Sequence, residues 1–432
     1  MMNNLQRTQP PVFPVERVVI PEVQSFTLKN GVPVYLINAG TEDIMRMELA
    51  FRAGQVRESV PLLSSTTNMM LSEGSQSYSS EELNRLLDYY GAFLNLSHEK
   101  DLAGAVLFFL SKHIEKVLEL TRELVFRPVF PEHELNALMK KRHTWFLMNK
   151  EKAGNQAIDQ FFESSFGNAH PYGRQVYEQD FEKMNPSIIK EFHSEYYTPE
   201  NMTLIISGKI HPRTTELLNY YFGEMKPLKN QKEDKGISIR GEGLKEIYIE
   251  KKGVAQTAVR IGSPTINKRH SDYPGLKILN TILGGYFGSR LMKNIREEKG
   301  FTYGIGSSVS SLNLSGYKVI STEVSPKNLK ETIDEIFKEI RLLQNVPVSG
   351  DEMEVVRNYM SGEMVRMFDG PFAIAESFRS VWEFGLDNNY YHKLSEKILK
   401  IEPDEIIELA RTYYNIDELY QVTVGPNEKE AS

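Results

Sequence analysis

Two side chains in the second half of the chain, Arg296 and Tyr303, have the types and spacing that suggest chemistry. They lie in the segment 284–307, GGYFGSRLMKNIREEKGFTYGIGS, which predicts a glycine turn, an amphipathic helix, a glycine stop at Gly300 and then a strand. Such a corner can direct both side chains at one point, and two converging donors can polarise the carbonyl of an amide. The alternative is an ordinary helix-to-strand connection, with Arg296 complementing the helix dipole and Tyr303 packed in a core.

Local motifs supply no complete catalytic centre. The 432 residues contain no cysteine, which excludes disulfides, thiol catalysis and cysteine-bound metal. No two of the nine histidines lie within five residues of each other, so the i, i+4 pair that binds zinc on one helix face is absent. A nucleophile elbow and a phosphate-binding loop are absent as well. Zinc held by distant histidines stays possible.

Composition excludes several partners. The net charge of −7 provides no basic footprint for nucleic acid. No apolar run reaches the roughly 18 residues of a membrane span. We therefore expect a soluble protein, with the compartment open between cytoplasm and periplasm.

The sequence repeats itself at long range. Residues 185–208, NPSIIKEFHSEYYTPENMTLIISG, match residues 402–425, EPDEIIELARTYYNIDELYQVTVG, and residues 111–138 resemble residues 325–356. Two matches in the same order indicate duplicated domains, because a period this long is not that of a solenoid. Linker composition at 226–243 places the boundary near residue 235, which divides the chain into domains 1–235 and 236–432.

Strands and helices mix within each half without strict alternation, and this pattern favours an α+β fold. We predict two homologous tandem domains, each a largely antiparallel sheet covered by helices on one face. In the first half the predicted strands are 34–38, 45–52, 91–96, 103–110 and 202–207, and the predicted helices are 62–70, 80–90, 112–125, 132–149 and 187–197. The basic run 140–143 is expected on a solvated helix face.

These features resemble the pitrilysin/insulinase metallopeptidase family, which includes the mitochondrial processing peptidases. The resemblance covers nearly the whole chain and includes GSRLMKNIREEKGFTYGIGSS, HPYGR and YYTPENMTLIISG. It implies that Arg296 and Tyr303 hydrogen-bond the scissile carbonyl and stabilise its oxyanion during attack by zinc-bound water. It also implies that the turn at Gly284 and Gly285 binds substrate.

The zinc motif of the family is not present. Catalytic members carry H-x-x-E-H on the helix predicted at 62–70, and the alignment places Ser65, Asn68 and Met69 at the His, Glu and His positions. A hydroxyl and a thioether do not hold Zn²⁺ under ordinary conditions, and a neutral amide is no general base. The third ligand of the family, a glutamate, aligns near Trp145 and Phe146, which are apolar.

The leading hypothesis is therefore a non-catalytic subunit of a heterodimeric zinc metallopeptidase that cleaves peptides. The chain itself would bind no cofactor, and zinc would reside in an H-x-x-E-H-bearing partner subunit. The alternative is a catalytically dead homodimeric scaffold or peptide-binding protein, in which Arg296 and Tyr303 are remnants. An autonomous peptidase with another metal arrangement is the remaining alternative.

Overall fold

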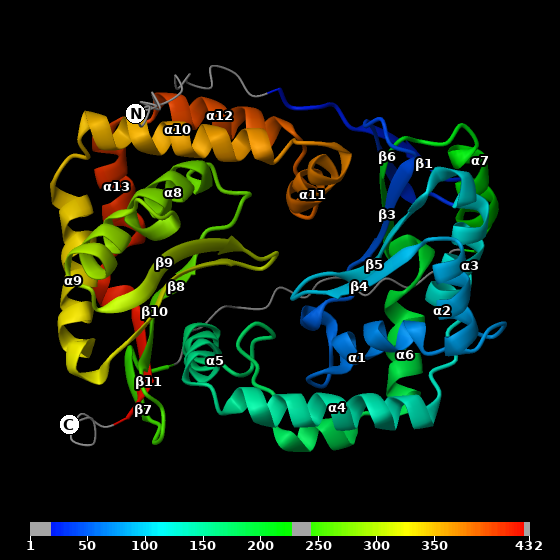
Figure 1. Ribbon diagram of the computed structural model, residues 1–432, viewed down its shortest axis with the longest axis horizontal. Helices are drawn as coiled ribbons and strands as arrows, with labels where there is room; N and C mark the ends of the chain where they lie inside the picture. The colour runs from blue at the N-terminus through cyan, green and yellow to red at the C-terminus, as the bar shows by residue number, and fades with distance from the viewer. Residues whose placement is uncertain (1–18, 227–242, 427–432) are drawn as a thin grey trace, which may run out of the picture.

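Figure 1 shows the computed structural model of the chain, which describes residues 19–226 and 243–426. Two β-sheets lie on opposite sides of the molecule, one from each half of the chain, with helices around them. The boundary expected at residue 235 falls outside the described residues, so the division into domains 1–235 and 236–432 remains a proposal.

Six strands form the first sheet, in the order β1-β2-β6-β3-β5-β4. β2 and β6 are parallel, and the other neighbouring strands are antiparallel. The strands are β1 Gln24–Thr27, β2 Pro33–Asn38, β3 Ile44–Phe51, β4 Phe93–His98, β5 Ala103–Leu110 and β6 Met202–Gly208.

The second sheet repeats this plan. Its order is β7-β11-β8-β10-β9, with β7 and β11 parallel and the remaining pairs antiparallel. The strands are β7 Glu246–Glu250, β8 Thr257–Thr265, β9 Thr302–Ser311, β10 Gly316–Val324 and β11 Tyr420–Gly425. From β2 to β4 and from β7 to β9, strand order and pairing agree, which supports our proposal of domain duplication.

Helices of each half cover one face of the sheet of that half, as the α+β prediction requires. In α3, for example, Val117, Leu118 and Leu124 recur at helical spacing and are buried in the first core. The helices of this layer are α1 Leu63–Met69, α2 Ser80–Tyr89, α3 Ile114–Phe126, α6 Pro186–Tyr196 and α7 Thr214–Leu218 in the first half, and α8 Tyr273–Asn280, α9 Leu329–Asn345, α12 Asn389–Lys400 and α13 Pro403–Tyr413 in the second. The predicted fold class is confirmed.

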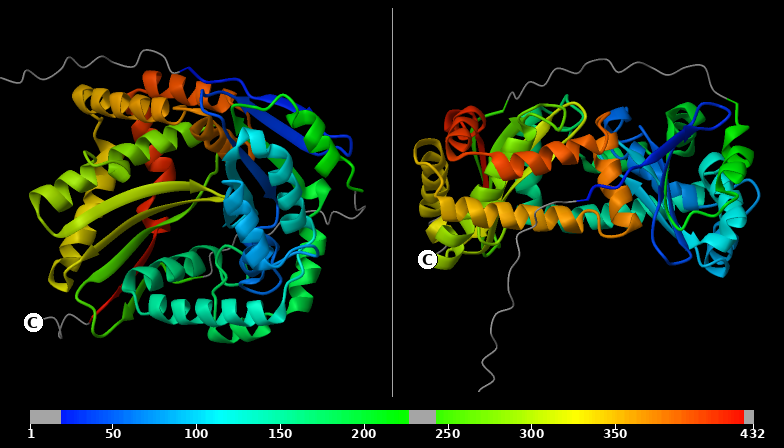
Figure 2. Two further views of the ribbon diagram at one scale, coloured as in Figure 1. Left: turned by 45° about the vertical axis from the view of Figure 1, so that its right-hand side comes forward. Right: turned by 90° about the horizontal axis from the view of Figure 1, so that it is seen from above.

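The opposite face of each sheet takes a helix from the other half, which the sequence did not predict. The long helices α4 (Glu132–Lys150) and α10 (Gly350–Arg366) run across the molecule and lead into α5 (Ala153–Phe166) and α11 (Pro371–Trp382) (Figures 1 and 2). α5 packs on β8 and β11 of the second sheet, and α11 packs on β2 and β6 of the first.

Strand alternation explains how one sheet serves two cores. Leu204 and Ile206 of β6 point into the first core, whereas Ile205 between them contacts Phe378 of α11. Arg379 of α11 also forms ion pairs with Glu48 of β3 and with Glu99, each at 2.9 Å. The two halves are therefore held together by buried apolar contacts and by charge.

Among the described residues, no helix combines the length and the apolar character needed to cross a membrane.

Candidate functional site

The segment that carries Arg296 and Tyr303 has the predicted order of elements. A helical turn ends in Gly285, a second helical segment spans Met292–Glu298, and β9 begins at Thr302. Gly300 has φ +67°, a left-handed conformation that favours glycine and stops the helix. Both helical segments, η7 (Thr281–Gly285) and η8 (Met292–Glu298), have π-type hydrogen bonding, which occurs frequently at functional sites.

Glycine is required at position 284 for packing. A Cβ at Gly284 would lie 2.7 Å from the backbone nitrogen of Ser307 in β9, which is closer than real Cβ atoms approach. Asn280 ties the same elements together, because its Nδ2 donates to the carbonyl of Ser307 and its Oδ1 accepts from the Ser307 hydroxyl. The turn before η8 is thus locked against β9. The expected role of Gly284 and Gly285 in substrate binding remains a prediction.

Tyr303 stands on an exposed edge. β9 ends the strand order of the second sheet, and Tyr303 is 92% exposed. The register with β10 shifts between Thr322 and Val324, so Tyr303 and Gly304 together face one residue, Glu323. Bulges of this kind redirect side chains and are common beside active sites.

Arg296 lies in the last turn of η8, and the central carbon of its guanidinium group lies 4.8 Å from the ring centroid of Phe287. Within residues 19–226 and 243–426, neither Arg296 nor Tyr303 forms a hydrogen bond or an ion pair with another side chain. Both side chains therefore keep their donors available for a ligand. Their convergence on one carbonyl remains a prediction.

The helix that aligns with the zinc motif is α1, and its side chains are engaged in structural contacts. Asn68 is fully buried, donates to the carbonyl of Ser97 at 2.8 Å and accepts from the Tyr197 hydroxyl at 2.9 Å. Ser65 is 6% exposed and donates to the carbonyl of Leu62 at 3.1 Å. Met69, four residues after Ser65, offers only a thioether.

A cation of the protein itself lies against this helix. Arg142 of α4 donates to the Ser65 hydroxyl at 2.7 Å and to the Thr66 hydroxyl at 2.5 Å. Trp145, predicted at the position of the third ligand, is 68% exposed, one turn further along the helix. The sequence assigned the run 140–143 to a solvated face. That expectation is wrong for Arg142, which turns inward onto α1.

Burial sets the electrostatics of this region. Desolvation raises the pKa of Glu58 to about 7, although the backbone of Ser64 and the charges of Arg174 and Arg142 act in the opposite direction. Burial lowers the pKa of Arg142 to about 10, which leaves it charged at neutral pH. Burial and the nearby Arg142 charge lower the pKa of His98. These groups line a cavity of about 300 Å³ together with Ser65.

The side chains present do not fit zinc. A guanidinium group repels a metal cation, and the amide of Asn68 already uses its donor and its acceptor. In the part of the chain that the structure describes, no three His, Asp or Glu residues are grouped to hold a metal ion. The geometry gives no route for metal-assisted hydrolysis at α1.

The HPYGR segment, which contributed to the resemblance, connects the halves. The Tyr172 hydroxyl donates to Asp101 of the first half and accepts from the backbone N–H of Leu314, between β9 and β10. Asp101 also accepts from the backbone of Asn313 at 2.9 Å. The hairpin that begins with the Tyr303 strand is therefore anchored at its tip by the first half.

The fold and this site define a two-sheet α+β protein in which the helix predicted to align with a zinc motif, α1, does not fit zinc. Residues 183–360 match the family model described as the peptidase M16 inactive domain. This match, together with relatives named as zinc proteases, agrees with the resemblance to the pitrilysin/insulinase peptidases that the sequence predicted.

Individual relatives are distant in sequence and similar in fold. An uncharacterized zinc protease, YmxG of Bacillus subtilis, is 23% identical over 79% of this chain and 84% of its own length. The zinc protease PqqE of Helicobacter pylori is 22% identical over 65% of each chain. A crystal structure titled peptidase M16 inactive domain from Pseudomonas fluorescens covers 94% of this chain and 99% of its own, with a TM-score of 0.85 and 22% identity.

Proposed function

We propose that the chain is the non-catalytic, Arg/Tyr-contributing subunit of a heterodimeric zinc metallopeptidase that cleaves peptides. The partner subunit would carry the H-x-x-E-H motif and the zinc ion, and this chain would bind no metal. Arg296 and Tyr303 would donate hydrogen bonds to the scissile carbonyl and to the oxyanion formed from it. The turn at Gly284 and Gly285 would contact the substrate backbone.

The observation that carries the proposal is the contact of Arg142 with α1. A positive charge hydrogen-bonded to Ser65 and Thr66 stands at the helix where catalytic members bind a metal cation. The sequence places no zinc-binding residue types at positions 65, 68 and 69. The Arg142 contact adds a positive charge there, which opposes the binding of a metal cation. By contrast, Arg296 and Tyr303 have side-chain donors that no other described residue uses.

The position of Tyr303 on an edge strand also supports a peptide substrate. An extended peptide can pair with the free edge of a sheet through main-chain hydrogen bonds. β9 offers such an edge in the second sheet, and the bulge at Tyr303 lies on it. A substrate strand beside β9 would bring its carbonyl groups close to the Tyr303 hydroxyl.

Reconstitution tests the proposal. The isolated chain should contain no stoichiometric zinc and hydrolyse no peptide, and addition of an H-x-x-E-H-bearing partner should produce peptide cleavage. In that complex, Arg296→Ala or Tyr303→Phe should lower kcat by about 10- to 1000-fold, the range for loss of one oxyanion donor. Complex formation, measured by analytical ultracentrifugation, should be unchanged.

Matched controls are available on exposed helices. Arg85→Ala in α2 and Tyr220→Phe in η6 (Asn219–Gly223) make the same chemical changes far along the chain from β9, and they should leave kcat unchanged. Full activity of both Arg296→Ala and Tyr303→Phe complexes would contradict the proposal and favour the scaffold. Stoichiometric zinc in the purified chain would contradict it independently.

A further inference from the structure

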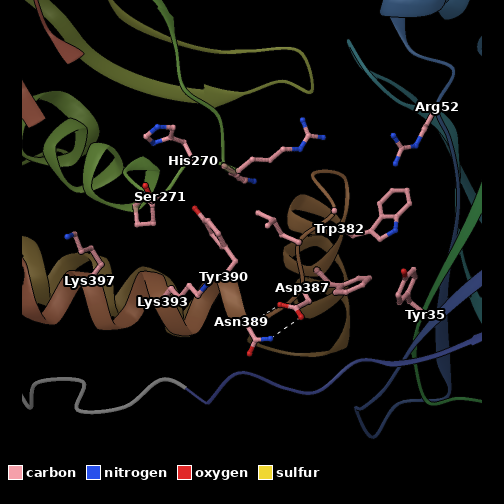
Figure 3. A pocket seen from close by; sticks show the side chains of 16 residues that line it. Tyr35, Arg52, His270, Ser271, Trp382, Asp387, Asn389, Tyr390, Lys393 and Lys397 are labelled. Carbon is pink, nitrogen blue, oxygen red and sulfur yellow. Dashed lines mark hydrogen bonds between the residues drawn. The ribbon is translucent and has the colours of Figure 1, made fainter. Parts of the chain in front are cut away.

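A cavity of about 710 Å³ lies where the two halves meet (Figure 3), and neither Arg296 nor a residue of α1 lines it. Tyr35 of β2 and Arg52, just after β3, line it from the first half. The loop before α8, helix α11 and helix α12 line it from the second half. The volume lies within the range of small-molecule and peptide side-chain pockets.

The walls of this cavity are strongly basic in a chain whose net charge is −7. One carboxylate, Asp387, stands on the walls, and both of its oxygens accept from Asn389 (Figure 3). The Lys and Arg side chains that line the cavity are Arg52, Lys268, Arg269, Lys393 and Lys397. The local charge is therefore opposite to that of the whole molecule.

Two of these cations have side chains without a hydrogen bond or an ion pair to the described residues. Lys397 is paired with Glu405, and the Arg269 guanidinium donates to Asn313 and to the carbonyl of Phe384. In contrast, Arg52 and Lys393 are exposed, and their side chains form no hydrogen bond or ion pair within the described ranges 19–226 and 243–426. An unpaired cation on the wall of a cavity is available to an anionic ligand.

Lys268 is a partly buried cation on the wall of this cavity. Its amino group donates to the carbonyl of Ser380 at 2.6 Å and lies 5.3 Å from the ring centroid of Phe384. Burial, followed by the charge of Lys277, lowers the pKa of Lys268 to about 8. An anion bound beside Lys268 would raise this pKa again, because an opposite charge favours the charged amino group.

The arrangement of the cations selects the shape of the ligand. In Figure 3, Arg52 lies at one end of the cavity and Lys393 and Lys397 lie at the other, with Tyr390 and Trp382 between them. A single phosphate or carboxylate requires cations that converge on one point, and these do not converge. An elongated ligand with separated negative charges can reach both ends.

Aromatic side chains form the wall near Arg52. The ring of Tyr35 lies 4.7 Å from that of Phe378 and 6.5 Å from that of Trp382, measured between centroids. Such a surface accepts an apolar or aromatic side chain. A ligand that suits both features carries carboxylates on either side of an apolar group.

We propose that this cavity binds an acidic peptide segment, with carboxylates at Arg52 and Lys393 and an apolar side chain against Tyr35, Phe378 and Trp382. Binding there goes beyond the proposed catalytic role and needs no partner subunit. Because residues of both halves line the cavity, a bound segment would also bridge the two halves.

Tryptophan fluorescence tests this site directly. The chain has two tryptophans, and Trp145 is 68% exposed on α4, so Trp145→Phe leaves Trp382 as the single reporter in the cavity. Titration with acetyl-Glu-Glu-Phe-Glu-Glu-amide should give a saturable change in Trp382 emission, and the Gln-Gln-Phe-Gln-Gln peptide should give none. Binding should weaken as salt increases, because exposed charges are screened.

Single substitutions distinguish binding in the cavity from unspecific electrostatic attraction of the acidic peptide to the protein surface. Arg52→Gln or Lys393→Gln should weaken binding of the acidic peptide at least tenfold. Arg85→Gln in α2 and Lys330→Gln in α9 remove the same charge from exposed positions outside the cavity and should leave binding unchanged. All four changes are at exposed side chains, so thermal melting should confirm folded protein in each case.

Equal weakening by the cavity and control variants would overturn the proposal, since attraction would then be unspecific. Tripolyphosphate that binds as tightly as the peptide and displaces it would overturn the peptide assignment in favour of a general polyanion site. A peptide with Phe replaced by Gly that binds with unchanged affinity would refute the aromatic contact.

Discussion

Replacement of Glu58 by Gln should remove a large part of the pH dependence of stability. Glu58 is 7% exposed, and its Oε2 accepts from the backbone N–H of Ser64 at the start of α1. A Gln side chain has nearly the same shape and can accept the same hydrogen bond. The substitution therefore isolates the ionisation of the carboxyl group from its packing.

The magnitude follows from the pKa of Glu58, which burial raises from about 4.5 to about 7. Below pH 4.5 the carboxyl is neutral in the folded and unfolded states. As the pH rises from about 4.5 to about 7, the carboxyl loses its proton in the unfolded state but not yet in the folded state, so the free energy of unfolding falls. At about 1.4 kcal/mol per pH unit, the whole window corresponds to about 3 kcal/mol. Above pH 7 Glu58 is ionised in the folded state as well, so the protein is destabilised by the full free energy of burying this charge.

The assay is urea unfolding of wild type and Glu58→Gln at pH 5 and pH 8, each with its own m-value. Wild type should lose stability between the two pH values, and the variant should lose about 2 to 3 kcal/mol less, given the same window. Burial also raises the pKa of Glu383 to about 7, so a slope should remain in the variant. Glu81→Gln, an exposed substitution in α2, should behave as wild type. Equal pH dependence of wild type and Glu58→Gln would refute the reasoning.

Two further predictions concern α1 and α5, the helix of the first half that packs on the second sheet. The triple variant Ser65→His, Asn68→Glu, Met69→His should bind zinc weakly and show negligible turnover, because Arg142 still lies on α1; efficient peptide hydrolysis would contradict this. Phe161→Ala in α5 should cost about 3–5 kcal/mol in urea unfolding, since this ring is fully buried against the second sheet, whereas exposed Tyr89→Ala should cost little. Similar losses for both would mean that α5 does not stabilise the second half.

Local patterns predicted most of the individual elements. The strand predicted at 103–110 is β5 with the same bounds, and the helix predicted at 132–149 differs from α4 by one residue. These elements have strong alternation or helical periodicity, which depends only on near neighbours in the chain. The corner at Gly300 was predictable for the same reason, because glycine permits the left-handed turn that ends the helix.

Helix α5 was missed, although a signal was present. Ala153, Ala157 and Phe161 recur every four residues, which marks one helix face. The sequence does not say which sheet this face covers. Its packing on β8 and β11 follows from the course of α4 across the molecule.

The predicted site residues divide in the same way. The sequence identified Ser65, Asn68 and Met69 as unsuited to zinc from their chemistry alone. It could not reveal that Arg142, 77 residues after Ser65, donates to that serine. A basic residue in a charged run is usually solvated, and only the position of α4 against α1 turns this one inward.

The sequence by itself determined most of the local elements and the α+β class, because these depend on residue type and short-range spacing. It also predicted the repeated halves and the absence of zinc ligands at Ser65, Asn68 and Met69. Only the tertiary structure decided that the halves exchange α5 and α11, that Arg142 lies on the zinc-motif helix and that basic side chains from both halves line one cavity. These contacts join residues far apart in the chain. They depend on which apolar helix face packs on which sheet, and a local sequence pattern does not specify that pairing.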